Sequence, residues 1–244
     1  MNVYETEKLL AEYLLFHYGA PEEILPYAFG PRDALEYPAR CVSECVGELP
    51  ANARALDLGC AVGRSSFELA RRCTEVIGID YSQSFIRAAT KLRQAGELGY
   101  SRLDEGPRST PLLARVPAEI DRRRVKFERG DAQALRAGLG VFDVVLLANL
   151  VDRLHAPGRC LEQLASLVKP GGQLVITSPY TWLEEYTPRE NWLCGEAGNT
   201  LAGLRADLGD DFELTGTKDL PFLIREHARK FQWSVAQASI WRRR

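Results

Sequence analysis

The pattern of apolar and polar positions predicts a helical start to the chain. Residues 5–18 place apolar side chains at helical spacing, which indicates an amphipathic helix. The stretch 19–38 mixes aromatic residues with glycine and proline, so we expect a loop with one short helix there. Residues 1–50 are interpreted as an N-terminal cap on a larger body.

The middle of the chain alternates between short apolar runs and segments with helical spacing. Strands are expected at 53–58, 76–80, 125–128, 142–148 and 173–177, and helices at 65–73, 82–94 and 158–168. Strands that alternate with helices form parallel β-α-β units, so the pattern predicts a doubly wound α/β sheet. Residues 212–218 and 231–242 resemble two further strands, which predict an antiparallel pair that closes this sheet.

One polar segment, residues 95–124, interrupts the alternation and is interpreted as an insertion. A connection of this length inside a compact domain usually has a function or is mobile. With 244 residues in total, we expect a single domain that spans residues 1–244.

Composition narrows the class of protein. The 31 Lys and Arg residues nearly balance 33 Asp and Glu, so no basic field favours nucleic acid as a partner. No apolar stretch reaches the roughly 18 residues of a membrane helix, and no membrane partner is expected. The acidic N-terminus does not resemble an export signal, and the six cysteines are scattered. We therefore expect a cytoplasmic protein with reduced thiols.

The main chemical signal is a glycine-containing turn after the first strand of the alternation. Asp57 ends that strand, and Gly59 and Gly63 follow without the G-x-G-x-x-G spacing of a dinucleotide site. This spacing argues against a nicotinamide oxidoreductase. Asp80 ends the second strand, where a carboxylate can bind ribose hydroxyls. The combination suits a ligand with an ammonium group and a ribose, such as S-adenosylmethionine.

This turn resembles the first motif of class I S-adenosylmethionine-dependent methyltransferases, commonly Asp-x-Gly-x-Gly-x-Gly, with Ala61 at the middle glycine. Gly130-Asp131-Ala132, Asn149-Leu150 and the segment 167–172 resemble later motifs of that family, in the same order. The resemblance implies a Rossmann-like, mostly parallel seven-stranded twisted sheet with helices on both faces and an antiparallel C-terminal strand. It also implies S-adenosylmethionine as cofactor, S-adenosylhomocysteine as its product, and no metal.

At the positions that match these motifs, the resemblance implies a cofactor site. Its expected members are Asp57, Gly59, Cys60, Gly63, Arg64, Asp80, Tyr81, Ser82, Asp131, Ala132, Asn149 and Leu150.

The flanking segments 27–32, 149–154, 178–188 and 220–230 resemble the methyltransferase of the ovothiol pathway. That resemblance implies N-methylation of the imidazole of 5-thiohistidine, which gives ovothiol A. In that family the domain occurs behind an iron-dependent sulfoxide synthase or as a separate protein. A functional link to such a synthase is therefore expected.

The implied methyl acceptor, 5-thiohistidine, is a zwitterion. Its carboxylate needs a basic side chain to pair with, and its imidazole ring needs aromatic side chains to pack against. The residues expected to bind it are Tyr27, Phe29, Arg32, Arg153, Trp182 and Arg225. Because the sulfonium is an activated methyl donor, we expect a weak or dispensable general base. The catalytic candidates are Asp152, Tyr180 and His227, with His155 as a further candidate base.

Two alternatives stay open from the sequence. The same core motifs would serve a methyltransferase that acts on another small amine, thiol or imidazole. They would also serve a non-catalytic module that binds S-adenosylmethionine and regulates a partner.

Overall fold

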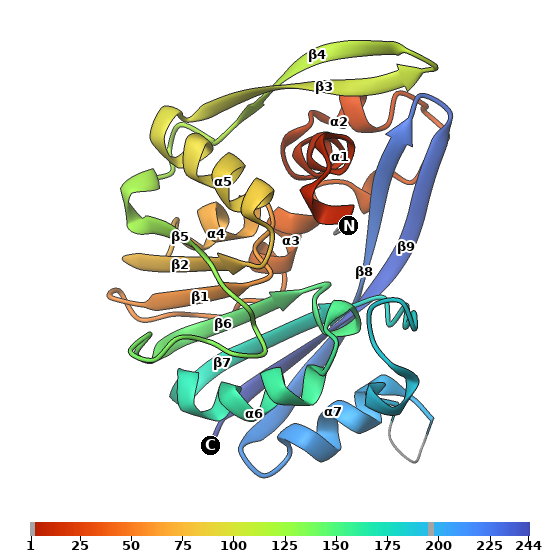
Figure 1. Cartoon of the computed structure of the whole chain (residues 1–244). Helices are drawn as coiled ribbons and strands as arrows, with labels where there is room; N and C mark the ends of the chain where they lie inside the picture. The colour runs from red at the N-terminus through yellow and green to blue at the C-terminus, as the bar shows by residue number, and fades with distance from the viewer. Residues whose placement is uncertain (1–2, 195–197) are drawn as a thin grey trace.

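The computed structural model describes residues 3–194 and 198–244 (Figure 1). The strands of the main sheet are β1 (Arg54–Leu58), β2 (Glu75–Asp80), β5 (Val125–Arg129), β6 (Phe142–Ala148), β7 (Val168–Ser178), β8 (Phe212–His227) and β9 (Lys230–Arg243). The α-helices are α1 (Glu7–Tyr18), α2 (Pro21–Ile24), α3 (Tyr37–Ser43), α4 (Arg64–Leu69), α5 (Gln83–Ala95), α6 (Pro157–Leu167) and α7 (Thr200–Leu208).

The seven strands lie in the order β5-β2-β1-β6-β7-β9-β8. The first five are parallel, whereas β9 pairs antiparallel with both β7 and β8. The predicted sheet, mostly parallel with antiparallel C-terminal strands, is therefore confirmed. Parallel strands bring their carboxyl ends to one edge, which is where such sheets bind ligands.

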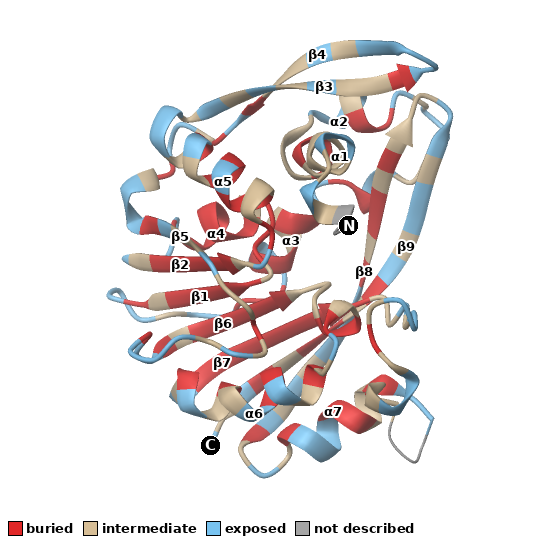
Figure 2. Ribbon diagram, viewed as in Figure 1, coloured by how far each residue is buried: buried red, intermediate tan, exposed pale blue. Residues whose placement is uncertain are grey.

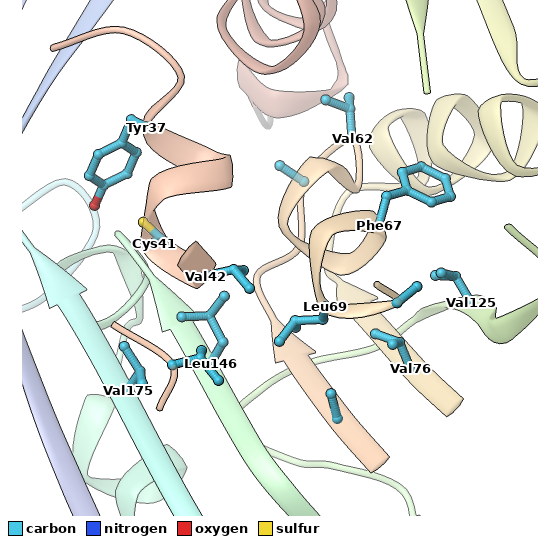
Figure 3. Packing of buried hydrophobic residues seen from close by; sticks show 14 of the residues in the cluster. Tyr37, Cys41, Val42, Val62, Phe67, Leu69, Val76, Val125, Leu146 and Val175 are labelled. Carbon is cyan, nitrogen blue, oxygen red and sulfur yellow. The ribbon is translucent and has the colours of Figure 1, made fainter. Parts of the chain in front are cut away.

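Alternate side chains of each strand pack on opposite faces of the sheet. On β6, Val144 and Leu146 pack with residues of α3, α4 and α5, whereas Val145 and Leu147 pack with residues of α6 and α7. Figure 3 shows the first of these clusters, and Figure 2 shows that the central strands are the most deeply buried part of the sheet. Both faces are thus covered, as the near-continuous apolar strands predict.

The insertion forms an antiparallel hairpin of its own, β3 (Glu97–Glu105) and β4 (Arg108–Arg115), outside the main sheet. It packs against α1 and β8, and the Ala228 amide donates to the Asp104 carbonyl at 2.9 Å. The sequence indicated the insertion but not these strands. Their inward positions include Arg102 and Asp104 as well as Leu98 and Tyr100, so the apolar alternation that marks a strand is broken.

The C-terminal strands are longer than predicted. β8 continues past residue 218 to His227, and a two-residue turn joins it to β9. This extended part of the β8–β9 ribbon reaches the N-terminal helices and the hairpin (Figure 1). Helices α3 and α7 were not predicted, because each is short and lacks a clear apolar period.

Candidate active site

A cavity of about 460 Å³ opens at the carboxyl ends of β1, β2 and β6, with α1 forming part of its wall. The structure brings together most of the residues predicted to hold the cofactor. Those that line the cavity are Asp57, Gly59, Cys60, Asp80, Tyr81, Ser82, Asp131, Ala132, Asn149 and Leu150. They come from four separate loops of the sheet edge, as the predicted topology requires.

The turn between β1 and α4 has a left-handed backbone at three positions. Gly59, Ala61 and Gly63 have φ values of 72°, 48° and 89°. The amides of Gly59 and Cys60 donate to the carbonyl of Ile79 at 2.8 and 3.1 Å, which fixes the turn against β2. The left-handed region costs L-residues about 1–2 kcal/mol, so Ala61 holds a conformation that glycine adopts with less strain.

Glycine at position 59 leaves room for the side chain of Leu150. A Cβ there would lie 2.9 Å from the side chain of Leu150, which itself lines the cavity. The positive φ disfavours other residues in any case. Gly59 therefore shapes the wall through Leu150 as well as through its own backbone.

Two predicted cofactor residues, Gly63 and Arg64, lie outside the cavity wall. A Cβ on Gly63 would lie 2.5 Å from the ring of Phe127, so this glycine allows core packing. The Arg64 guanidinium pairs with Glu68 at 2.7 Å and lies over the ring of Tyr18. Gly63 and Arg64 thus contribute to the packing and the first turn of α4, and their predicted contact with the cofactor stays a prediction.

Asp57 fits the positively charged part of the expected cofactor. Its side chain is buried, and one oxygen accepts a hydrogen bond from the Ser66 hydroxyl at 2.5 Å. The other oxygen has no hydrogen-bond partner among the described residues, although Asp57 lines the cavity. Burial raises the pKa of this carboxyl to about 7. A buried carboxylate with a free oxygen can bind the ammonium group of S-adenosylmethionine, so the residues present fit this cofactor.

Two backbone amides from different loops hold the Asp80 carboxylate in place. Its two oxygens accept hydrogen bonds from the amides of Ala61 at 2.9 Å and Ser82 at 2.8 Å. Burial raises the pKa of Asp80 to about 6. The Ser82 hydroxyl caps α5 and donates to the carbonyl of Tyr4, so the loop after β2 is well fixed. A carboxylate fixed in this way can accept hydrogen bonds from ribose hydroxyls.

Arg153 lines the cavity and is supported by its neighbour Asp152. Its Nη1 donates to the Asp152 carboxylate at 3.0 Å and to the Thr181 carbonyl at 2.8 Å, and the guanidinium lies 5.2 Å from the centre of the Tyr186 ring. Asp152 itself is fully buried and does not line the cavity. Its carboxylate thus helps to hold Arg153 in position, and the predicted catalytic role of Asp152 stays a prediction without support from the cavity lining.

The structure adds residues that the sequence analysis missed. Tyr4, Tyr13, His17 and Tyr186 line the cavity from the N-terminal segment and from the loop after β7, and His155 also lines it. Burial lowers the pKa of His17 to about 3, so this ring is neutral at physiological pH. The amphipathic pattern of residues 5–18 did indicate a buried helix face, but nothing in it shows that this face borders a site.

Tyr37 and Asn149 link the N-terminal cap to the end of β6. The Tyr37 hydroxyl donates to Asn149 Oδ1 at 2.6 Å and lies 2.7 Å from the hydroxyl of Thr177. Asn149 has a φ of 52°, in the left-handed region that asparagine tolerates better than most residues. Both side chains line the cavity, so the cap contributes directly to its wall.

Several predicted acceptor residues lie outside this cavity. Phe29 is 89% exposed and stacks on Tyr27, whose hydroxyl donates to the carbonyl of Ala228 at 3.1 Å. Arg32 faces Glu22 at 3.8 Å on the surface. The aromatic segment around residue 27 therefore packs against the β8–β9 turn, a contact between distant parts of the chain that the sequence did not reveal.

Trp182, Tyr180 and His227 also do not line the cavity. Trp182 donates to the Thr200 hydroxyl at 2.9 Å, and the Tyr180 hydroxyl lies 3.2 Å from Gln237 Oε1. His227 ends β8, where its Nδ1 accepts a hydrogen bond from the amide of Arg229 at 3.3 Å. These contacts give all three side chains structural positions. They support neither the predicted catalytic roles of Tyr180 and His227 nor the predicted contact of Trp182 with the acceptor.

Arg225 likewise lies outside the cavity, although it was predicted to bind the acceptor carboxylate. It is 5% exposed and donates to the carbonyl of Glu23 at 2.7 Å, with Asp104 at 3.8 Å. It therefore connects β8, α2 and the hairpin.

We expect Arg225→Ala to lower the free energy of unfolding by about 1.5–3 kcal/mol, the usual loss for a hydrogen bond to a charged group. Chemical denaturation monitored by circular dichroism would measure this. A variant with unchanged stability and a raised KM for the acceptor would instead support the original prediction.

Comparison with known proteins agrees with this geometry. Residues 56–176 match the protein family described as "Methyltransferase domain". A curated relative, the ubiquinone biosynthesis O-methyltransferase of Caulobacter sp. (strain K31), is 32% identical over 127 residues, which are 51% of this chain and 40% of the relative. The chain thus matches less than half the length of that relative.

Solved structures show the same fold at low sequence identity. YcgJ from Bacillus subtilis superposes with a TM-score of 0.56 at 14% identity, over 85% of this chain and 97% of YcgJ. A TehB-like SAM-dependent methyltransferase from Corynebacterium glutamicum gives a TM-score of 0.51 at 16% identity, over 85% and 87% of the two chains. Residues 56–176 therefore match a methyltransferase domain, and the solved structures share its Rossmann-like fold.

Among residues 3–194 and 198–244, no helix is long and apolar enough to cross a membrane. Within the same ranges, no group of three or more His, Cys, Asp or Glu side chains is arranged to hold a metal ion.

The raised pKa of Asp57 predicts that cofactor affinity depends on pH. Below about pH 7 the free protein carries a neutral Asp57, and binding of an ammonium group then requires loss of a proton. Affinity for S-adenosylmethionine should therefore fall as pH decreases below 7, by up to about tenfold per unit. Titration calorimetry from pH 8 downwards measures this slope.

Asp57→Asn is the matched control, because it keeps the side-chain shape but cannot titrate. This variant should bind S-adenosylmethionine more weakly, and its affinity should not change between pH 7 and 6. Asp80, with a pKa of about 6, contributes to the pH dependence only at lower pH. A wild-type affinity that is constant from pH 8 to 6 would contradict the assignment of Asp57 to the ammonium group.

Proposed function

We propose that this protein transfers the methyl group of S-adenosylmethionine to an imidazole nitrogen of 5-thiohistidine, forming ovothiol A. The observation that carries the proposal is the position of Arg153. Of the arginines that the sequence offered as partners for an acceptor carboxylate, it is the one that lines the cavity. The similarity of the flanking segments to the ovothiol-pathway methyltransferase supports the same acceptor.

The cavity wall offers complementary groups for a zwitterionic aromatic acceptor. The Arg153 guanidinium can pair with the carboxylate, and Glu185 also lines the cavity and can pair with the ammonium group. Tyr13 and Tyr186 provide aromatic surface for the imidazole ring. These contacts would fix the ring while leaving one nitrogen directed at the methyl group.

When bound, S-adenosylmethionine supplies a sulfonium that is already activated for methyl transfer. The chain's own residues then have to align the nucleophile and exclude water. His17 stays neutral because of its burial, so it can accept or donate a hydrogen bond without placing a second positive charge near the sulfonium. The ring proton of the acceptor can leave to solvent, so the mechanism does not depend on a strong base in the wall.

The proposal also includes a functional partner and a cellular location. The thiol of the acceptor has to be installed before methylation, so we infer a functional link to an iron-dependent sulfoxide synthase. We also infer that the protein works in the cytoplasm, and the free state of all six cysteines supports this.

The curated relatives support a second candidate, O-methylation of a phenolic ring, since they are named as ubiquinone biosynthesis O-methyltransferases. Such an acceptor carries no carboxylate and gives Arg153 no partner. A non-catalytic module that only binds the cofactor is the third possibility.

A panel of acceptors separates these candidates. Formation of S-adenosylhomocysteine would be measured with 5-thiohistidine, histidine, decarboxylated 5-thiohistidine and a catechol. The proposal expects turnover with 5-thiohistidine and a strong loss when its carboxylate is removed. Preference for the catechol would favour the O-methyltransferase, and cofactor binding without turnover on any acceptor would favour the binding module.

A further inference from the structure

A second cavity, of about 800 Å³, lies between α1, α5 and the β3–β4 hairpin. Helix α1 separates it from the first cavity. Tyr13 and His17 line the first, whereas Leu10 and Ala11 line the second. No lining residue is shared between the two, so the second cavity is not an extension of the methyltransferase site.

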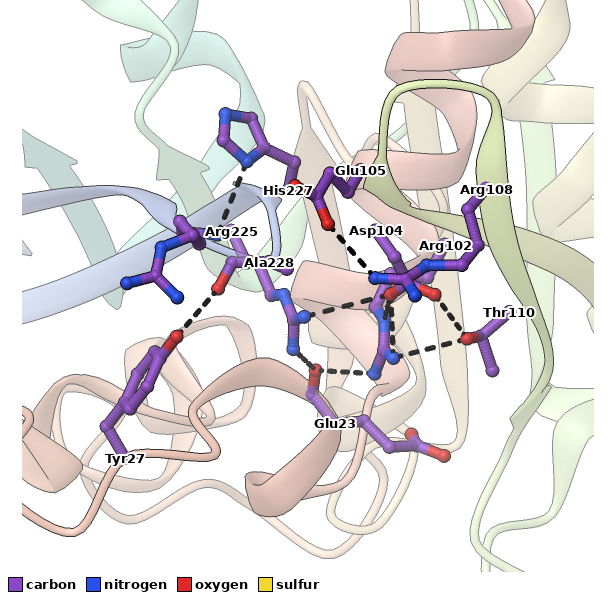
Figure 4. A network of polar contacts seen from close by, with 11 residues as sticks. Glu23, Tyr27, Arg102, Asp104, Glu105, Arg108, Thr110, Arg225, His227 and Ala228 are labelled. Carbon is purple, nitrogen blue, oxygen red and sulfur yellow. Dashed lines mark hydrogen bonds and ion pairs between the residues drawn. The ribbon is translucent and has the colours of Figure 1, made fainter.

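Arg102 and Arg225 line one end of this cavity and contact the same two oxygen-bearing groups. Arg102 and Arg225 donate to the carbonyl of Glu23 at 3.1 and 2.7 Å, and both face Asp104, at 2.9 and 3.8 Å (Figure 4). Two guanidinium groups thus share a single carboxylate, which leaves an excess of positive charge. Arg225 is 5% exposed, so water can do little to screen that charge.

Two polar atoms beside this cavity lack partners. Among the described residues, Arg225 Nε and the hydroxyl of Tyr100 are buried without a hydrogen bond, and both residues line the cavity. Buried polar groups are almost always hydrogen-bonded, and an unpaired one costs about 1–3 kcal/mol. Arg225 Nε can only donate a hydrogen bond and the Tyr100 hydroxyl can donate one, so a single acceptor group would satisfy both.

The rest of the wall is apolar on one side and mostly basic at the rim. Leu10, Leu14 and Leu98 provide the apolar surface. The charged residues that line the cavity are Lys8, Arg87, Lys91, Arg102 and Arg225 against Glu7, Glu12 and Glu226. The balance favours a ligand with a negative charge and an apolar part.

We propose that this cavity binds a small organic carboxylate with an apolar or aromatic body. The carboxylate would accept hydrogen bonds from Arg225 Nε and the Tyr100 hydroxyl, while the body would pack against Leu10, Leu14 and Leu98. This site is separate from methyl transfer and does not depend on the acceptor proposed above.

The first experiment compares three probes with the same body and different head groups. Binding of 3-phenylpropionate, 3-phenylpropylamine and 3-phenyl-1-propanol to the full chain would be measured by titration calorimetry. The carboxylate should bind at least about tenfold more tightly than the other two, since only it pairs with the arginines. Absence of binding, or equal binding of all three probes, would overturn the proposal.

The second experiment locates the site with variants. Ala11→Trp places a large side chain on the cavity wall and should abolish binding of 3-phenylpropionate. Ala206→Trp, on the exposed surface of α7, is the matched control and should bind normally. Arg225→Lys keeps the charge but removes the Nε donor, and should weaken binding about tenfold or more.

Calorimetry with S-adenosylmethionine on the same preparations shows whether each variant is folded. Unchanged binding of 3-phenylpropionate to Ala11→Trp would contradict the proposal, because the probe would then bind elsewhere.

Discussion

Replacing Asp80 by alanine is expected to weaken the binding of S-adenosylmethionine ten- to a hundredfold. A hydrogen bond to a charged group contributes about 1.5–3 kcal/mol, and about 1.4 kcal/mol corresponds to a factor of ten. Asp80 lines the cavity at the end of β2, and the amides of Ala61 and Ser82 hold its carboxylate in position. Titration calorimetry with the cofactor measures the change directly.

The control for this prediction is Asp210→Ala, which removes an exposed carboxylate distant in the sequence from the site loops. It should bind the cofactor like the wild type. If Asp80→Ala also binds normally and its circular dichroism spectrum is native, the assignment of Asp80 to the ribose is wrong.

Replacing Arg153 by glutamine is expected to lower kcat/KM for the acceptor about a hundredfold, with cofactor affinity nearly unchanged. The reason is loss of a charge-assisted pair with the acceptor carboxylate in a partly enclosed cavity, which costs about 2–5 kcal/mol. The change would also leave the buried Asp152 without its ion pair, so stability should be measured on the same preparation. Steady-state kinetics and cofactor calorimetry together test this.

Arg32→Gln is a suitable comparison, because the sequence proposed Arg32 for the same role and the structure places it outside the cavity. Its kinetics should match the wild type. Equal losses of acceptor and cofactor affinity in Arg153→Gln would show that Arg153 supports the fold or the cofactor site and does not bind the acceptor.

The cofactor half of the site could be predicted from sequence because its signals are local. Asp57 lies one residue before the end of β1 and Asp80 ends β2, and the topology of a parallel sheet brings the ends of such strands to one edge. The same reasoning places Asn149 after β6. Gly63 and Arg64 belong to the same motif but face the core and α4, because a motif fixes sequence position and does not fix side-chain direction.

The acceptor half could not be predicted in the same way. Tyr13 and His17 reach the cavity because α1 packs across the sheet edge, a contact between segments more than forty residues apart in sequence. Arg225 lies outside the cavity for a related reason, because its partners Glu23 and Asp104 come from helix α2 and from the hairpin. In both cases the position of the side chain depends on packing between segments that are distant in sequence. The spacing of residues along the chain does not reveal such packing.

The central claim is tested most directly by identifying the product formed from 5-thiohistidine and S-adenosylmethionine with a ¹³C-labelled methyl group. Mass spectrometry would show whether one methyl group has been added, and the carbon chemical shift would show which atom carries it. The proposal predicts a single labelled methyl group on a ring nitrogen, in an amount equal to the S-adenosylhomocysteine released. A label on sulfur, or no labelled product under conditions in which the protein binds both compounds, would contradict it.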